Sequence, residues 1–286
     1  MPEKSRVAGL ARRPDMTGTV RRLLKLILVV VLLVGTAQGT TLAAPTSWDY
    51  VALGDSMATG YGAFVKGYVP RYEAYVETDT GVAVTRTNLA QNKWTSSQLL
   101  SALSSDPTFR RAIREAEIVT WNIGGNDLRA ARASYKNGTC GGVDNQDCLR
   151  ASVATLKTNW TAITAEVLEL RSTENTMVRT MDIYNPYVRT DIASDTWKND
   201  GGMNDFQVFN SYVYKANLHI ATTSYAAGVP YAGVHLAFNG PYGYEDPKPK
   251  GYLSFDGLHP NNTGHRVIAG ELQKLGYAPL YALLLR

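Results

Sequence analysis

Apolar residues recur along the chain at two different spacings, and these spacings predict the secondary structure. Between Cys148 and Arg171 they recur at steps of three and four residues, the period of an α-helix with one buried face. The positions concerned are Leu149, Val153, Leu156, Trp160, Ile163, Val167 and Leu170. Helical spacing also runs from Asn204 to Ala227, and from Ser96 to Ala116 with an interruption at Pro107.

Short apolar runs bounded by turn residues predict five strands. These runs are Trp48–Leu53, Val82–Thr87, Glu117–Ile123, Met177–Ile183 and Val229–Phe238. A short helix over Pro70–Glu77 and a last helix over Asn262–Leu275, capped by Asn261 or Asn262, complete the pattern. Strands that alternate with helices of this length predict one α/β domain, a three-layer α/β/α sandwich around a mainly parallel five-stranded sheet. Such sheets bind ligands at the carboxyl ends of their strands, so functional side chains are expected directly after strands.

The first 44 residues have a pattern of their own. Basic residues precede an uncharged, mostly apolar run of twelve residues from Leu26 to Ala37, and small residues follow it up to Pro45. This is typical of a secretory signal peptide, and the run is shorter than the roughly 20 residues of a membrane-spanning helix. We therefore expect a signal peptide over residues 1–44 and a single secreted domain over 45–286. An uncleaved anchor starting at Leu23 is the alternative, and it would be the chain's only expected membrane contact.

Removal of that segment changes the charge of the chain. The whole sequence has a formal net charge of +4, but residues 1–44 contain seven of its 29 basic and two of its 25 acidic side chains. The remainder is close to neutral and shows no basic stripe with interleaved aromatic residues, so nucleic acid is not an expected partner.

Cys140 and Cys148 lie in a polar, glycine-rich stretch without further metal ligands nearby. In an oxidising compartment two such cysteines favour a small loop disulfide over two free thiols. A disulfide here is expected to fasten a loop and not the core.

Ser56 follows the first expected strand in the tripeptide Gly-Asp-Ser, where it could act as a nucleophile. The alternative is that Ser56 caps the helix that starts there, since serine commonly accepts a backbone hydrogen bond at that position. The tripeptide alone favours the cap.

A second motif, W-N-I-G-G-N-D, follows the third expected strand and ends at Asp127. Its two glycines permit a tight turn that would leave the Asn126 amide at the same sheet edge as Ser56. A neutral amide there can donate a hydrogen bond to the oxyanion of a tetrahedral intermediate. The alternative, equally favoured by the motif alone, is that Asn126 or Asp127 caps the following helix.

A third motif, S-F-D-G-L-H-P, precedes the last expected helix. Asp256 and His259 are three residues apart in this turn, so the carboxylate can orient an imidazole that serves as the base for a serine. The other histidines have structural interpretations: His219 lies on a helix, His235 inside the fifth expected strand, and His265 in the last helix near the site. No metal-ligand spacing and no phosphate-binding loop is present in the sequence, and no cofactor is expected.

In this order, G-D-S, G-G-N-D and D-G-L-H-P resemble the motifs of the GDSL, or SGNH, hydrolase family, over a span from Asp49 to about Leu275. The resemblance implies an esterase or lipase with Ser56 as nucleophile, His259 as base, Asp256 as its orienting acid and Asn126 as an oxyanion donor. It implies acyl transfer without a metal or organic cofactor.

One stretch departs from the family pattern. Where the family has a sequence like N-L-G-x-x-G-x-T, this chain reads N-L-A-Q-N-K-W-T, so Ala90 and Lys93 occupy the glycine positions. The backbone amides of Lys93 and Ser56 are expected to complete the oxyanion hole beside Asn126. The alternative is that Lys93 is a solvated loop residue and that the hole is weaker.

The substrate is expected to be a small-molecule, lipid or polysaccharide ester, and the protein a monomer. A polysaccharide O-acetyl esterase with the same triad is the enzymatic alternative, and a non-catalytic exported carbohydrate- or surface-binding module is the other. The stretch Asn239–Phe255 contains Tyr242, Tyr244 and Tyr252, which could rim the pocket. We favour a surface loop without a substrate role for this segment, because it is rich in proline and glycine.

Overall fold

The computed structural model describes residues 47–174, 176–198 and 201–284, all within one compact unit of the chain. The expected signal peptide over residues 1–44 lies outside the described residues. Within the part that is described, no helix is both long and apolar enough to cross a membrane.

Five parallel strands form a single sheet. They are β1 (Ser47–Gly54), β2 (Ala83–Asn88), β3 (Ile118–Asn122), β4 (Met177–Met181) and β5 (Tyr231–Ala232). Their order in the sheet is β2-β1-β3-β4-β5, and each neighbouring pair is parallel. The chain therefore reverses its direction of winding after β2, because β2 and β3 lie on opposite sides of β1. At such a reversal the carboxyl ends of the two diverging strands, here β1 and β3, border a crevice.

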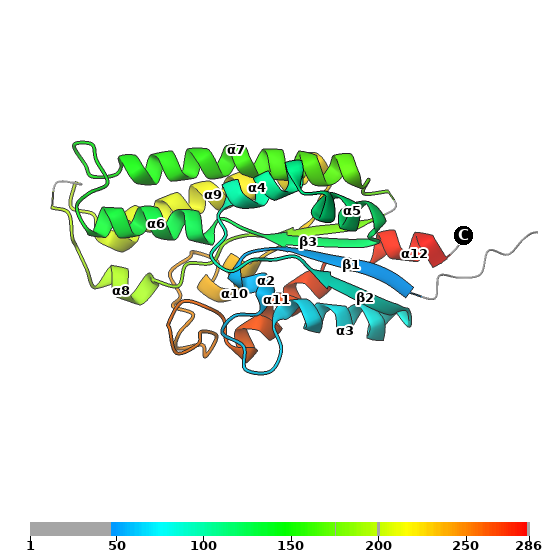
Figure 1. Ribbon diagram of the computed structural model, residues 1–286. Helices are drawn as coiled ribbons and strands as arrows, with labels where there is room; N and C mark the ends of the chain where they lie inside the picture. Colours follow the sequence, from blue (N-terminus) through cyan, green and yellow to red (C-terminus); the bar gives the residue numbers. More distant parts are fainter. Residues whose placement is uncertain (1–46, 175, 199–200, 285–286) are drawn as a thin grey trace, which may run out of the picture. The chain divides into compact units, whose positions relative to one another are not determined.

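Helices cover both faces of the sheet, as the alternating pattern predicts (Figure 1). On one face lie α4 (Ser96–Ser105), α5 (Pro107–Glu115), α6 (Gly125–Lys136), α7 (Asp147–Leu170) and α9 (Asp205–Ala227). The other face carries α3 (Tyr68–Thr80), α10 (Val234–Asn239), α11 (Asn262–Gln273) and α12 (Ala278–Leu284). Two short helices, α2 (Ser56–Thr59) and α8 (Val188–Ile192), sit in loops. The predicted three-layer α/β/α fold is thereby confirmed.

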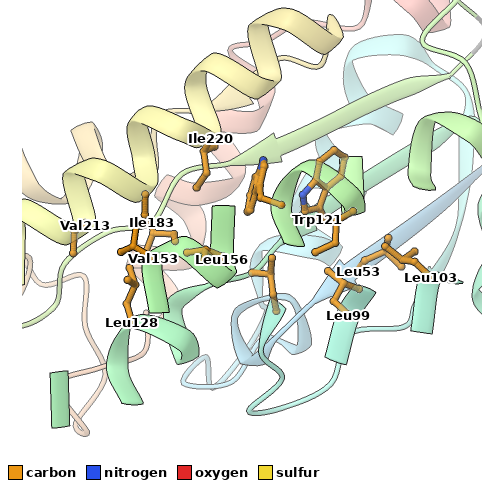
Figure 2. Packing of buried hydrophobic residues seen from close by; sticks show 14 of the residues in the cluster. Leu53, Leu99, Leu103, Trp121, Leu128, Val153, Leu156, Ile183, Val213 and Ile220 are labelled. Atoms are coloured by element: carbon orange, nitrogen blue, oxygen red, sulfur yellow. The ribbon is translucent and has the colours of Figure 1, made fainter. Parts of the chain in front are cut away.

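Residues of β1, β3 and β4 alternate between the two cores, because successive side chains of a strand point to opposite faces. Leu53 and Trp121 pack against α4 and α7 in the first core, shown in Figure 2. Trp48 and Tyr50 pack against α3 and α11 in the second. Most side chains of both cores are almost completely buried, and protein interiors are close-packed, so the carboxyl ends of β1 and β3 are held in fixed positions.

The fifth predicted strand is wrong over most of its length. The pattern predicts a strand over Val229–Phe238, but only Tyr231–Ala232 pairs with β4, and helix α10 begins two residues later. His235 therefore lies in a helix and not inside a strand. The carboxylate of Asp182, directly after β4, accepts a hydrogen bond from the His235 backbone amide at 2.7 Å, and so starts this helix from another part of the chain.

The predicted disulfide is present. Cys140 and Cys148 are bonded with their Cα atoms 4.8 Å apart, and the bond joins the loop after α6 to the first turn of α7. It lies in a connection on one side of the sheet, as a loop staple should.

Candidate active site

The hydroxyl of Ser56 does not cap helix α2. Asp55 and not Ser56 is the N-cap of this helix, because its carboxylate accepts the Met57 amide at 3.0 Å. The turn out of β1 passes through Gly54, whose φ of +132° and close approach to the Asn122 carbonyl exclude a side chain. Ser56 is the first helical residue and is buried at the carboxyl end of β1. The interpretation of Ser56 as a helix cap is therefore wrong.

Ser56, His259 and Asp256 form a continuous chain of hydrogen bonds. The Ser56 Oγ lies 2.9 Å from His259 Nε2, and His259 Nδ1 lies 2.6 Å from Asp256 Oδ2. Because a carboxylate can only accept, Nδ1 carries the proton and Nε2 is the acceptor for the serine hydroxyl. The structure thus brings together the three residues that the first and third motifs single out, from opposite ends of the described chain.

The second carboxylate oxygen of Asp256 holds the turn in shape. It accepts the Ser254 hydroxyl at 2.6 Å and the backbone amides of Leu258 and His259 at 2.9 and 3.0 Å. Partial burial disfavours the ionised carboxylate, but the hydrogen bonds from Ser254 and His259 outweigh it and hold the pKa of Asp256 well below its ordinary value. Asp256 is therefore a carboxylate throughout the neutral range.

Two neighbouring aromatic residues support His259. The ring of Tyr61 lies 4.5 Å from the imidazole, centroid to centroid, and the Tyr184 hydroxyl donates to the Leu258 carbonyl at 2.5 Å. The Tyr61 carbonyl in turn accepts from Nε2 of His265, a fully buried residue of α11 whose Nδ1 accepts the Tyr68 amide. Burial lowers the pKa of His265 to about 4, so it is neutral and structural, as the sequence predicts for a histidine near the site.

Asn126 lies in the first turn of α6, beside the end of β3. Its amide nitrogen donates to the Trp94 carbonyl at 2.9 Å, which fixes the side chain toward the loop after β2. Gly124 is the N-cap of the helix, and the Asp127 carboxylate instead accepts the amide and hydroxyl of Ser96 at the start of α4. Neither Asn126 nor Asp127 caps α6, so the helix-cap interpretation of this motif is wrong.

Lys93 adopts the backbone conformation of a glycine. Its φ is +69°, in the left-handed region that side chains other than glycine rarely occupy. It lies between Asn92, which accepts the Thr59 hydroxyl of α2, and Trp94, which accepts the amide of Asn126. The loop that carries Lys93 is therefore fastened to both other parts of the site, while its side chain is exposed.

An apolar pocket opens from the hydroxyl of Ser56. His259 and Asn126 line it together with the serine. Apolar side chains from the end of β3, α6, the end of β4 and the segment after it, α9 and the turn before α11 line the rest of its wall: Ile123, Leu128, Met181, Ile183, Tyr184, Pro186, Tyr187, Phe209, Val213 and Leu258. These wall residues were missed by sequence reasoning, because an apolar pocket residue has the same periodicity as a core residue.

The tyrosines of the Asn239–Phe255 segment are placed away from that wall. Tyr244 packs against Phe206, Tyr252 packs against Phe238, and Tyr242 is exposed. Among the described residues, no group of three or more histidine, cysteine, aspartate or glutamate side chains is arranged to hold a metal ion.

A parallel α/β protein that joins a serine, a histidine and an aspartate at the carboxyl edge of its sheet has the architecture of a hydrolase. The chain belongs to the GDSL-like Lipase/Acylhydrolase family, whose model matches residues 52–267. The family supports the class of ester hydrolases.

Individual relatives agree with this placement. The chain is 26% identical to the spore germination lipase LipC of Bacillus licheniformis over 236 residues, which is 81% of this chain and 98% of that protein. The lipase Lip_vut3 from a goat rumen metagenome has the same fold, with a TM-score of 0.66, 22% identity and coverage of 82% of this chain and 99% of that one. Phospholipase A1 from Streptomyces albidoflavus NA297 also shares it, with a TM-score of 0.56, 18% identity and coverage of 81% and 99%.

Proposed function

We propose that this protein is a serine carboxylic ester hydrolase that works through an acyl-enzyme on Ser56. The observation that carries the proposal is the hydrogen-bonded chain from Ser56 through His259 to Asp256, which has the donor and acceptor directions that a serine nucleophile needs.

The reaction follows from these contacts in two halves. His259 Nε2 takes the hydroxyl proton while Ser56 Oγ bonds to the ester carbonyl carbon, and Asp256 stabilises the imidazolium that forms. The C–O bond to the alcohol then breaks and the alcohol leaves with that proton. In the second half water repeats the attack on the acyl-Ser56 ester, which releases the carboxylic acid and restores the serine.

Three donors are available for the oxyanion. We assign the backbone amides of Ser56 and Lys93 and the amide group of Asn126, whose second hydrogen is not used in its bond to Trp94. The left-handed backbone of Lys93 supports this assignment, because it reproduces at this position what a glycine would provide. One such donor is typically worth a factor of about 10² to 10³ in kcat.

The apolar wall of the pocket favours an acyl chain over an acetyl group. A chain of several methylene groups would remove its surface from water against Leu128, Ile183 and Val213, at about 0.8 kcal/mol per methylene. We therefore propose an esterase or lipase in preference to a polysaccharide O-acetyl esterase. The complete triad supports an enzyme in preference to a non-catalytic binding module.

We further propose that the protein is secreted. The signal-type sequence of the first 44 residues supports this, and so does the disulfide between Cys140 and Cys148, which is a bond of oxidising compartments.

The test is hydrolysis of a p-nitrophenyl ester series from acetate to palmitate, with Ser56→Ala measured beside the wild type. We expect turnover that requires Ser56 and rises with chain length up to the capacity of the pocket. In Val213→Phe the preferred chain should be shorter, since the larger ring fills the wall. An unchanged rate in Ser56→Ala would disprove the mechanism, and a preference for acetate in the wild type would restore the O-acetyl esterase.

A further inference from the structure

Two loops beside the active site expose large apolar side chains almost completely. Phe64 and Val65, between α2 and α3, are 87% and 77% exposed, and Phe255, before α11, is 90% exposed. We call these three residues the apolar rim. Scattered apolar residues are normal on a protein surface, but apolar side chains gathered beside a site mark an interaction surface.

The two loops of the apolar rim are in contact with each other. A Cβ on Gly62 would lie 2.5 Å from the Pro260 carbonyl and 3.4 Å from the Ser254 side chain, so the backbones approach closely. The Val65 amide also donates to the Asn262 side chain at 3.0 Å. The segment that carries Phe64 and Val65 therefore lies against the segment that carries Phe255, close to helix α2 after the end of β1. In Figure 1 the two segments are the loop between α2 and α3 and the loop that leads into α11.

The apolar rim adjoins the proposed base of the reaction. Tyr61, three residues before Phe64, contacts the His259 ring, and Phe255 directly precedes Asp256. A protein partner or a second copy of this chain seated on this surface would crowd His259 and hinder entry to Ser56. A lipid surface would instead bring ester bonds to the serine, so it is the occupant that is compatible with turnover.

Two cations, Lys66 and Arg71, lie beside Phe64 and Val65. The carboxylate beside Phe255, Asp256, is turned to His259 and Ser254, so the charge of the apolar rim favours an anionic surface. Lys66 follows Val65, is exposed, and forms no ion pair with the described residues. Arg71 of α3 donates to the Lys66 carbonyl, and the nearby Glu73 is already paired with Arg86. Cations beside anionic headgroups contribute about 1 kcal/mol each.

We propose that the apolar rim adsorbs the protein to the surface of aggregated anionic lipid, with Phe64, Val65 and Phe255 inserted among the acyl chains and the active site facing the lipid. This inference rests on the proposed ester hydrolysis and names the physical state of its substrate. From the sequence, the only expected membrane contact is an uncleaved segment within residues 1–44. The apolar rim adds a second contact, with the surface of the lipid.

The first test is binding without turnover. Ser56→Ala is mixed with vesicles of equal parts phosphatidylcholine and phosphatidylglycerol and sedimented, alone or combined with Phe64→Ser and Val65→Ser. We expect the two serines to lower the vesicle-bound fraction by at least about tenfold in partition coefficient, because both side chains lose their insertion energy. The matched control is Tyr225→Ser, which removes a 91% exposed ring from the last turn of α9, just before the amino end of β5, whereas the active site lies at the carboxyl ends of the strands. This control should bind vesicles as Ser56→Ala alone does.

The second test separates adsorption from catalysis in the enzyme with an intact Ser56. On p-nitrophenyl butyrate below its solubility limit, Phe64→Ser/Val65→Ser should keep kcat/KM within about twofold of wild type, since neither side chain lines the pocket. On the same phospholipid vesicles its rate should fall at least about fivefold. Phe255→Ser provides a second variant should the double one not fold, as judged by its melting curve.

The outcomes distinguish the two proposals. Vesicle binding that is absent in Ser56→Ala, or unchanged by the serines, would overturn the adsorption proposal and leave butyrate hydrolysis standing. A wild-type dimer in sedimentation equilibrium that Phe64→Ser/Val65→Ser converts to a monomer would also overturn it in favour of a second copy. Loss of butyrate hydrolysis in Ser56→Ala together with retained vesicle binding supports both.

Discussion

Asp55 accepts the backbone amide of Met57, and this bond performs the task that a serine before a helix usually performs. Ser56 lies between these two residues, so its own side chain is not needed to cap the helix. Ser56 is held in the first position of α2 by its neighbour's cap, and its own hydroxyl points to His259.

Ser56→Ala should therefore remove turnover without loss of stability. We expect hydrolysis of p-nitrophenyl butyrate to fall by at least about 10⁴-fold, and the free energy of unfolding in urea to stay within about 0.5 kcal/mol of wild type. A loss of 1 to 2 kcal/mol, the usual size of a removed cap, would show that Ser56 contributes to the helix start after all.

Asp256→Asn should lower kcat by about 10² to 10⁴-fold, with little change in KM. The amide would have to donate at one of the places where the carboxylate now accepts, so His259 loses either its orientation or its tautomer. Ser254→Ala is the matched control, since it removes one donor to Asp256 and leaves the contact with His259. Its kcat should fall by less than about tenfold, and equal losses in both variants would contradict a specific role for the carboxylate.

Asn126→Ala should lower kcat by about 10² to 10³-fold at a nearly unchanged KM, as expected for a donor that acts on the developing oxyanion. Asn92→Ala is the control, because Asn92 lies in the facing loop and bonds only to Thr59 among the described residues. A rate for Asn126→Ala within threefold of wild type would remove Asn126 from the oxyanion hole.

Lys93→Gly should keep the turnover of the wild type and increase the free energy of unfolding, because glycine adopts the left-handed backbone conformation without strain. A side chain in the left-handed region costs roughly 1 to 2 kcal/mol, and glycine returns roughly 0.5 to 1 of this in unfolded-state entropy. We expect a gain of up to about 1 kcal/mol in urea unfolding and a kcat within about threefold. A fall in kcat beyond tenfold would mean that the Lys93 ammonium, and not only its amide, takes part.

The buried carboxylate of Asp55 should give stability a particular pH dependence. Burial raises its pKa from 3.8 to about 6, against the opposing hydrogen bonds from Met57 and Asn122. Between these values the folded chain keeps a proton that the unfolded chain releases. The contribution of protonated Asp55 to stability is therefore complete below pH 3.8 and is lost as the pH rises through about 6.

Asp55→Asn has no such proton and should remove this contribution. The free energy of unfolding of wild type, relative to Asp55→Asn, should fall by up to about 3 kcal/mol from pH 4 to pH 7 in urea titrations. Parallel curves for the two proteins would contradict the raised pKa.

Most helices and strands can be predicted from the sequence, because the spacing of apolar residues and the turn residues that indicate them are local features of the chain. Four strands are predicted to within two residues of their ends, and the break at Pro107 separates α4 from α5 as expected. The fifth strand fails for a physical reason: an apolar run of this length fits a buried strand and a buried helix equally. What decides the matter is Asp182, 53 positions away from His235, and no local pattern contains that contact.

The site divides in the same way. Ser56, Asn126 and His259 stand in short sequence motifs, and the structure places these three in the lining of one pocket. Asp256 reaches that pocket only through its contact with His259, and Lys93 lies in the loop whose Trp94 carbonyl binds Asn126. Asp55 and Tyr61 act on Ser56 and His259 through contacts that depend on the packed fold. The sequence did not identify the helix cap correctly, because Asp55 and Ser56 are adjacent and both are common capping residues. The extended backbone of Asp55, which makes it the N-cap, is visible only in the structure.

Ser56 and His259 are separated by 203 positions, and their hydrogen bond has a consequence for the life of the chain. A growing or partly folded polypeptide carries Ser56 long before the turn with its base exists, and until then that serine reacts no faster than any other. The proposed nucleophile and base meet only when the turn before α11 has reached the carboxyl end of β1. If Ser56 is the nucleophile, as proposed, the onset of ester hydrolysis during refolding would report the formation of this contact, and a chain cut before His259 would lack the base.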